Sequence, residues 1–166
     1  MAIASGVSLE EYLHTEYEPD CDYVDGVLED RNVGQKDHGE TQTAIAAYFF
    51  LLKKRLRIRV VTELRMRVSA TRVRLPDVAI VADDDRDQVQ QEPPLLCIEI
   101  LSPDDRLSRL ARVIADYLAF GVPMIWIIDP YDRAAFVVTQ ENPAMQPVDE
   151  LRWNDVVLKL DEILPE

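Results

Sequence analysis

The sequence has few of the residues that mark zinc proteins, disulfide-rich proteins or membrane proteins. It contains two cysteines, Cys21 and Cys97, and two histidines in 166 residues. The cysteines lie in different segments without a second Cys or His at zinc-ligand spacing, so we expect plain thiols. No window reaches the roughly 18 apolar residues of a membrane span, and the N-terminus lacks the basic-then-apolar order of a signal peptide. We therefore expect a cytoplasmic protein without membrane contact.

Positive charge is also scarce. The chain has 18 Lys and Arg against 31 Asp and Glu, a net charge of -13, which argues against a general nucleic-acid binder because phosphate contacts need basic side chains. Residues 51–75 are the exception, with nine of the basic residues and one acid, Glu63. Such a run is usually solvated surface, but it also allows a local basic face on an acidic protein.

Local patterns in the N-terminal half predict helices and a hairpin within one domain over residues 1–166. Ser8 and Glu11 have capping-box spacing, which predicts a short helix to about residue 17. Asp25-Gly26 joins two strand-like segments, 22–24 and 27–29, as a hairpin turn. Apolar residues at spacings of three and four predict a long helix over residues 38–56.

The remaining segments predict an α/β protein. Residues 58–69 are strand-like, and the nearly continuous apolar runs 78–81 and 95–101 are expected to be central strands. The polar segment 83–92 is expected to be a surface loop. Ser102 and Pro103 are expected to open a second helix, whose apolar stripe runs from Leu107 to Gly121. The strand at 124–128 completes a strand-helix-strand crossover, followed by strands at 134–139 and, at an edge, 156–160.

Two acids interrupt this apolar pattern. Asp77 precedes the strand at 78–81, and Glu99 lies inside the strand at 95–101. A carboxylate in a buried strand is costly unless it is paired or bound to a cation. Magnesium prefers hard oxygen ligands and is often held by one or two carboxylates. The acids are therefore a candidate magnesium site, although spacing alone leaves open a simple ion pair between Glu99 and an arginine.

Several strings resemble one bacterial family. They are residues 75–81 (LPDVAIV), 98–103 (IEILSP), 117–123 (YLAFGVP) and 126–130 (WIIDP). Together they closely resemble the Uma-type restriction endonuclease-like family of the PD-(D/E)XK superfamily. The N-terminal helix, the hairpin and His38 also fit, so the resemblance covers about residues 8–140.

The resemblance implies a mixed sheet flanked by helices and a metal ion, Mg²⁺ or Mn²⁺, held by Asp77, Glu99 and the backbone carbonyl of Ile100. Asp22, where the family usually has Glu, would face the same cleft, and Asp22 and His38 would be auxiliary catalytic residues. For His38, a histidine bonded to backbone at the helix start is the alternative. The implied activity is metal-dependent hydrolysis of DNA phosphodiester bonds.

The chain departs from the family at the third signature residue. The superfamily has a Lys two positions after the acid, and here that position is Leu101. The Uma-type family tends to supply a Lys from the following helix, where this chain has Val113. Arg109 lies one turn from Val113 and is a better substitute than Arg106 or Arg112, unless all three are simply solvated. An arginine stays protonated, so it could stabilise phosphate charge but hardly act as a base.

Two main functions follow from these residues. The first is a metal-dependent DNA endonuclease, expected to be a homodimer with apolar residues such as Trp126 and Phe136 at the paired surface. The alternative is a catalytically decayed nuclease-fold protein that acts as a nucleic-acid-binding or protein-interaction module. No nucleophile elbow, P-loop or zinc motif points to another class of hydrolase.

Overall fold

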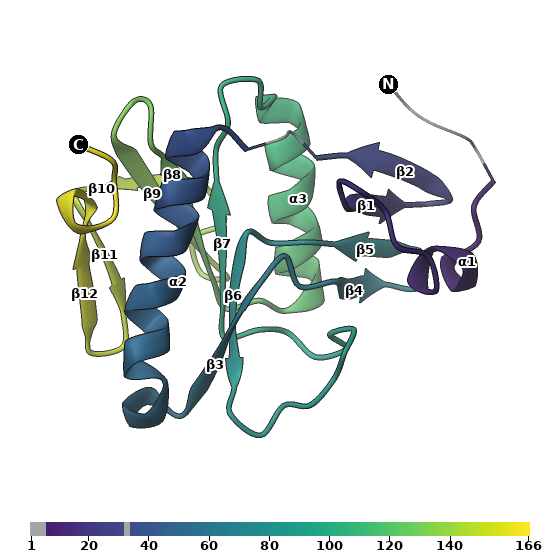
Figure 1. Cartoon of the computed structure of the whole chain (residues 1–166), viewed down its shortest axis with the longest axis horizontal. Helices are drawn as coiled ribbons and strands as arrows, with labels where there is room; N and C mark the ends of the chain where they lie inside the picture. The colour runs from purple at the N-terminus through teal and green to yellow at the C-terminus, as the bar shows by residue number, and fades with distance from the viewer. Residues whose placement is uncertain (1–5, 32–33) are drawn as a thin grey trace.

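The computed structural model describes residues 6–31 and 34–166. Its main sheet has six strands in the order β10-β9-β8-β7-β6-β3 (Figure 1). Their bounds are β3 (Ile58–Thr62), β6 (Val78–Ala82), β7 (Leu96–Ile100), β8 (Met124–Asp129), β9 (Ala134–Thr139) and β10 (Gln146–Val148). β7 and β8 run parallel and the other neighbours antiparallel. The predicted mixed sheet is confirmed.

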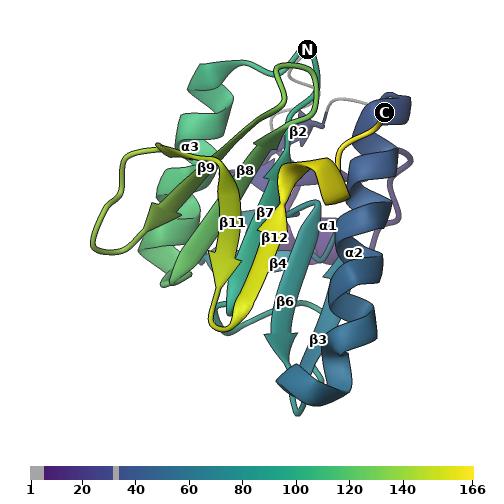
Figure 2. The ribbon, with the colours of Figure 1, turned by 90° about the vertical axis from the view of Figure 1, so that its left-hand side faces the viewer.

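Two long helices cover opposite faces of this sheet, α2 (Lys36–Leu56) and α3 (Leu107–Phe120) (Figure 2). Successive strand residues point to opposite faces. In β7, Ile98 belongs to the apolar cluster that contains Phe49 of α2, whereas Cys97 belongs to the cluster that contains Tyr117 of α3. The connection β7-α3-β8 is the predicted crossover.

A second sheet of four strands lies beside the first, in the order β2-β1-β5-β4, with α1 (Leu9–Leu13) near its far end (Figure 1). Its strands are β1 (Cys21–Val24), β2 (Val27–Asp30), β4 (Met66–Ser69) and β5 (Arg72–Arg74). Asp25 and Gly26 have φ angles of 51° and 89°, so the predicted hairpin turn is confirmed. The Ser8 hydroxyl accepts a hydrogen bond from the Glu11 N–H, as expected of the cap, but the helix ends at Leu13 rather than near residue 17.

The C-terminal residues form a hairpin of their own, β11 (Glu150–Trp153) and β12 (Val156–Lys159), followed by the short 3₁₀ helix η1 (Leu160–Glu162). The predicted strand at 156–160 is therefore present, but it is not an edge of the main sheet. Trp153 packs against Phe49 of α2 with ring centroids 6.0 Å apart. The hairpin thus extends the apolar layer on the α2 side.

The single strand predicted over residues 58–69 is wrong. The chain turns at Glu63, whose φ angle is 52°, and β3 and β4 belong to different sheets. The predicted helix start at Ser102 is also wrong, because residues 102–105 form a turn in which the Ser102 N–H donates to Asp105 Oδ2 (2.6 Å). The helix begins at Leu107, which is 76% exposed and so lies outside the apolar stripe.

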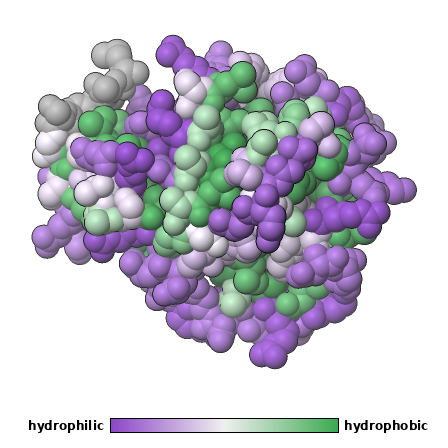
Figure 3. Space-filling model, turned by 180° about the vertical axis from the view of Figure 1, so that it is seen from behind, coloured by the Kyte–Doolittle hydropathy of each residue, from purple (hydrophilic) through white to green (hydrophobic). Residues whose placement is uncertain are grey.

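Trp126 is completely buried in the core, so it cannot line a dimer surface as expected. Phe136 is partly buried, and apolar residues do reach the surface on the back of the molecule, between hydrophilic ones (Figure 3). Both cysteines are free and buried. Within residues 6–31 and 34–166, no helix has the length and apolar character needed to cross a membrane.

Two glycines in different backbone conformations provide a test of the fold. Gly121 ends α3 with a φ angle of 107°, and a Cβ there would lie 3.2 Å from Pro93 Cγ. Gly39 lies inside α2, where a Cβ would meet nothing within 4 Å. We expect Gly121→Ala to lower the free energy of unfolding by about 1–2 kcal/mol, and Gly39→Ala to raise it by about 0.5–1 kcal/mol. Urea denaturation measures both, and changes of the same sign would contradict the assigned conformations.

Candidate active site

Asp77 and Glu99 face each other across two neighbouring strands. β6 and β7 pair with Val78 opposite Ile98, and the same antiparallel register continued by one residue puts Asp77 opposite Glu99. Glu99 points to the same face as Cys97, the face that α3 covers. The two residues are 4% and 8% exposed. Two carboxylates 22 positions apart in the sequence therefore meet in a buried place beneath α3.

Both oxygens of the Asp77 carboxylate already have partners. Oδ1 accepts from Arg31 Nη2 at 2.8 Å and lies 3.4 Å from His38 Nε2. Oδ2 accepts from the Ile100 N–H at 2.7 Å. Sequence reasoning missed the Arg31 contact, because Arg31 follows the hairpin and belongs to none of the strings that resemble the family. A cation from the hairpin thus lies directly on one of the two candidate metal ligands.

Glu99 is held by a tyrosine instead of a cation. The Tyr117 hydroxyl, from α3, donates to Glu99 Oε1 at 2.5 Å. Burial and the negative charge of Asp77 raise the pKa of Glu99 to about 8, although Arg31 and Arg109 act in the opposite direction. Burial also raises the pKa of Tyr117 well above its usual value, so its phenol remains a proton donor. The pair of carboxylates therefore lacks positive charge on the Glu99 side.

His38 lies in the first turns of α2 and faces Asp77 through Nε2. Burial alone would lower the pKa of His38, but the hydrogen bond and the charge of Asp77 raise it above its usual value. Gly34 lets the chain pass close behind the ring, since a Cβ there would be 2.7 Å from His38 Nδ1. Within the described residues, His38 therefore contacts the candidate site through Asp77.

Asp22 is also buried, but it belongs to a network of ion pairs. Asp22 Oδ2 accepts from Arg74 Nη1 at 2.9 Å and from Arg109 Nη2 at 2.8 Å. Its other oxygen accepts from the Leu75 N–H at 3.2 Å. Two guanidinium groups therefore neutralise the hairpin acid, which leaves it less available as a metal ligand.

The helix position expected for the missing lysine lies between these two groups of residues. Val113 is one turn from Arg109, which contacts Asp22, and one turn from Tyr117, which contacts Glu99. It is 2% exposed. A side chain at position 113 therefore projects from the face of α3 that meets both acids.

Two of the three arginines on this helix are paired rather than simply solvated. Arg109 pairs with Asp22, and Arg112 Nη2 lies 3.5 Å from Glu29 Oε1. Arg106 is exposed at the N-cap of α3.

The oxygen donors of Asp77 and Glu99 fit a hard divalent cation in part. A carboxylate has about four lone-pair positions, and the contacts above use three on Asp77 and one on Glu99. Among the described residues, no group of three or more His, Cys, Asp and Glu side chains is arranged to hold a metal. A cation here would depend on two carboxylates, a backbone carbonyl such as that of Ile100, and water.

Most basic residues of the stretch at 51–75 have partners within the chain. Five of its arginines pair with acids of this chain: Arg55, Arg57, Arg65, Arg72 and Arg74. Arg59 donates to the backbone carbonyl of Asp85, and Lys53 lies over the Phe50 ring. These contacts reduce the positive charge available to a phosphate backbone.

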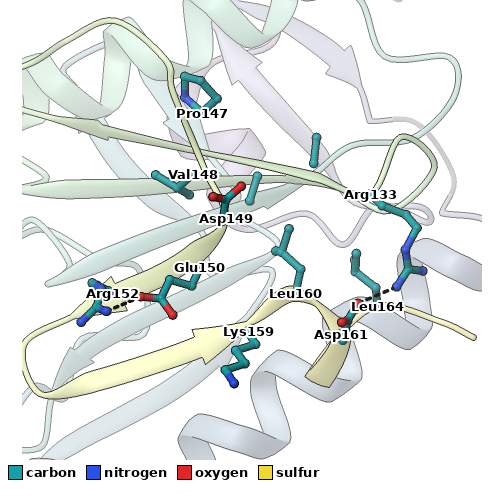
Figure 4. A pocket seen from close by; sticks show the side chains of 12 residues that line it. Arg133, Pro147, Val148, Asp149, Glu150, Arg152, Lys159, Leu160, Asp161 and Leu164 are labelled. Carbon is teal, nitrogen blue, oxygen red and sulfur yellow. Dashed lines mark hydrogen bonds and ion pairs between the residues drawn. The ribbon is translucent and has the colours of Figure 1, made fainter.

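A large groove lies elsewhere, between β9, β10 and the C-terminal hairpin (Figure 4). Two ion pairs lie along it, Arg133 with Asp161 and Arg152 with Glu150. None of the carboxylates beneath α3 lines it. Because Asp77 and Glu99 do not line it, the groove has no part in the candidate site.

A mixed sheet between two helices, with facing acids on adjacent strands, defines a nuclease-like α/β fold. The chain matches the Uma2 family, described as "Putative restriction endonuclease", over residues 9–166, and it belongs to that family. A similar solved structure is the crystal structure of "a putative nuclease belonging to DUF820 from Anabaena variabilis ATCC 29413". It has a TM-score of 0.83 and 22% identity, over 95% of this chain and 97% of that chain, and at this identity it shows the fold alone. A search of curated proteins finds no match.

The raised pKa of Glu99 predicts an unusual dependence of stability on pH in the absence of metal. An unfolded glutamate has a pKa of about 4.3, whereas that of the folded protein is about 8. The folded state thus binds the proton more tightly, so the stabilisation is present at low pH and lost as pH rises to about 8. Glu99→Gln retains an oxygen for Tyr117 but cannot titrate.

We therefore compare the free energies of unfolding of Glu99→Gln and the wild type. We expect the difference to change in favour of Glu99→Gln by on the order of a few kcal/mol as the pH rises from about 5 to about 8. Urea denaturation of both proteins in EDTA at several pH values measures this difference. The contributions of all other titratable groups are the same in both proteins and cancel. A difference that does not change with pH would mean that Glu99 is already ionised at pH 5.

Proposed function

We propose that this chain is a metal-dependent endonuclease that hydrolyses phosphodiester bonds of DNA. The observation that carries the proposal is the buried, facing pair of Asp77 and Glu99, which the protein's own cations leave short of positive charge. Membership of a restriction endonuclease-like family supports the same reaction class. We expect Mg²⁺ or Mn²⁺, because both accept carboxylate and carbonyl oxygens.

In this proposal Asp77, Glu99 and the Ile100 carbonyl hold the metal. When bound, the ion would activate a water molecule and neutralise charge on the scissile phosphate. His38 orients the Asp77 carboxylate through their contact, which raises the pKa of the imidazole above its usual value. Asp22 acts by fixing the Arg109 guanidinium at 2.8 Å, where its positive charge can favour a phosphate.

A specific set of contacts favours the second candidate, a decayed nuclease fold retained for binding. Leu101 and Val113 occupy both positions at which related proteins place a lysine. Arg31 contacts Asp77, and the basic stretch is largely paired with acids of this chain. Under this alternative the carboxylate pair remains as a structural feature and DNA is not cut.

We infer that a homodimer would suit cleavage of both strands of DNA. Phe136, which is only partly buried, is the remaining candidate from the sequence for an apolar contact between copies. A cytoplasmic location agrees with a DNA substrate and is part of the same proposal.

Metal binding provides the first test of the proposed function. We expect millimolar Mg²⁺ to raise the melting temperature of the wild type, because the ion binds only the folded protein, and Asp77→Asn to abolish the increase. Asp161→Asn removes an equal charge from the surface pair with Arg133 and should keep the increase. Differential scanning calorimetry with and without metal measures all three. An equal increase in Asp77→Asn would place the ion elsewhere.

A second test restores the missing ammonium group. We expect Val113→Lys to increase nicking of supercoiled plasmid in Mn²⁺, because position 113 projects toward both acids. A positioned catalytic group contributes roughly 10²- to 10⁴-fold, which is large enough to exceed contaminating nuclease. Adding Asp77→Ala to Val113→Lys should remove the gain. A Val113→Lys protein that folds and binds metal but leaves the plasmid intact would favour the alternative function, a catalytically decayed nuclease fold.

A further inference from the structure

Arg31 neutralises Asp77, and position 31 belongs to none of the strings that resemble the family. It follows the last residue of β2, Asp30, and its side chain is 14% exposed. Nη2 donates to Asp77 Oδ1 at 2.8 Å, and Nη1 lies 4.0 Å from Glu63 Oε1 on the surface. A single short hydrogen bond therefore connects Arg31 to the carboxylate pair.

Arg31 has fewer close carboxylate partners than Arg74 has. Arg74 is completely buried and contacts three carboxylates at 2.7–2.9 Å: Asp22, Glu29 and Asp116. Arg31 lies beyond the last ladder pair of its hairpin, Cys21 with Asp30, and has one close acidic partner. Its side chain can leave Asp77 without breaking strand pairing, whereas Arg74 cannot leave without taking a partner from three carboxylates, of which Asp22 is buried.

A guanidinium and a divalent cation compete for the same oxygen. Magnesium needs a lone pair at 2.0–2.1 Å in a nearly octahedral arrangement, and Arg31 already uses Asp77 Oδ1. Two positive groups on one carboxylate also repel each other in a buried place. Because arginine stays protonated at any ordinary pH, proton loss cannot remove this competitor.

We propose that Arg31 is a built-in competitor for the divalent cation: it neutralises Asp77 in the metal-free protein and leaves Asp77 when metal binds. The inference rests on the proposed function, because it requires a metal site at Asp77 and Glu99. It follows that the metal-free protein keeps this part of the site electrically balanced, at the expense of metal affinity.

The test is isothermal titration calorimetry with Mn²⁺ alone. Arg31→Gln removes the charge but keeps an amide donor for Asp77. One hydrogen bond between charged groups corresponds to about a tenfold to hundredfold change in an equilibrium constant, so we expect Arg31→Gln to bind Mn²⁺ at least about tenfold more tightly than the wild type. Arg112→Gln, which removes the same charge beside Glu29, should change affinity by no more than about twofold.

Two further variants complete the experiment. Arg31→Met, which also lacks the charge, should tighten binding in the same way and replaces Arg31→Gln if that variant does not fold. Arg31→Lys keeps a positive charge and should remain close to the wild type. A lysine variant that binds as tightly as the neutral variants would overturn the competition, because charge would then not be the cause.

Failure of this inference can be distinguished from failure of the proposed function. In one outcome the wild type binds Mn²⁺, Asp77→Asn does not, and the neutral Arg31 variants bind no more tightly than the wild type. This outcome would overturn the competition by Arg31 and would support the metal site. If neither the wild type nor the folded neutral variants bind Mn²⁺, both proposals fail together.

Discussion

The charge of Arg74 has to be neutralised inside the protein, and this requirement connects three strands of the small sheet to a helix outside that sheet. Arg74 is on β5, and its partners lie on β1 (Asp22), β2 (Glu29) and α3 (Asp116). Removing one partner from a buried ion pair costs about 3–5 kcal/mol, because an uncompensated charge remains. The network therefore fixes the small sheet against α3, the helix that also covers the carboxylate pair.

This network of ion pairs determines which carboxylates are left to bind a metal ion. The small sheet brings Asp22 close to α3, but Arg74 and Arg109 then engage one of its oxygens and the Leu75 N–H the other. Asp22 is in this way used to hold the fold. Asp77 and Glu99 face each other beneath α3, where burial, with the charge of Asp77 added, raises the pKa of Glu99, and Arg31 supplies a positive charge to Asp77.

Local rules were sufficient where one interaction decides the outcome. Asp25-Gly26 predicts its turn because few other pairs accept positive φ angles, and Asp77 and Glu99 were identified because each interrupts a run of apolar residues. The local patterns failed where the same residue types are compatible with two different backbone conformations. Ser102 and Asp105 have the composition of a helix cap but form a separate turn, and the positive φ angle of Glu63 cannot be read from its residue type.

Contacts between distant segments could not be predicted from the sequence at all. The sequence of an apolar strand does not tell whether a given face of the strand is buried or exposed. Trp126 was therefore expected at a surface, although it is packed beneath α2. Arg31 lies 46 positions before Asp77, and no spacing rule joins them. The site was therefore predictable as a pair of acids, but its counter-charges were not.

The nature of these counter-charges narrows the chemistry that the fold can support. Arg31 and Arg109 stay protonated, so they can stabilise negative charge but cannot accept a proton from water. Beside the proposed metal ligands, His38 has a pKa that the Asp77 carboxylate raises above its usual value. Hydrolysis by the proposed mechanism would depend on His38 for proton transfer, whereas a binding role requires only that the pair stay neutralised. Because the buried Val113 stands where the resemblance predicts a lysine, catalysis would depend on whether a metal can take the place of Arg31.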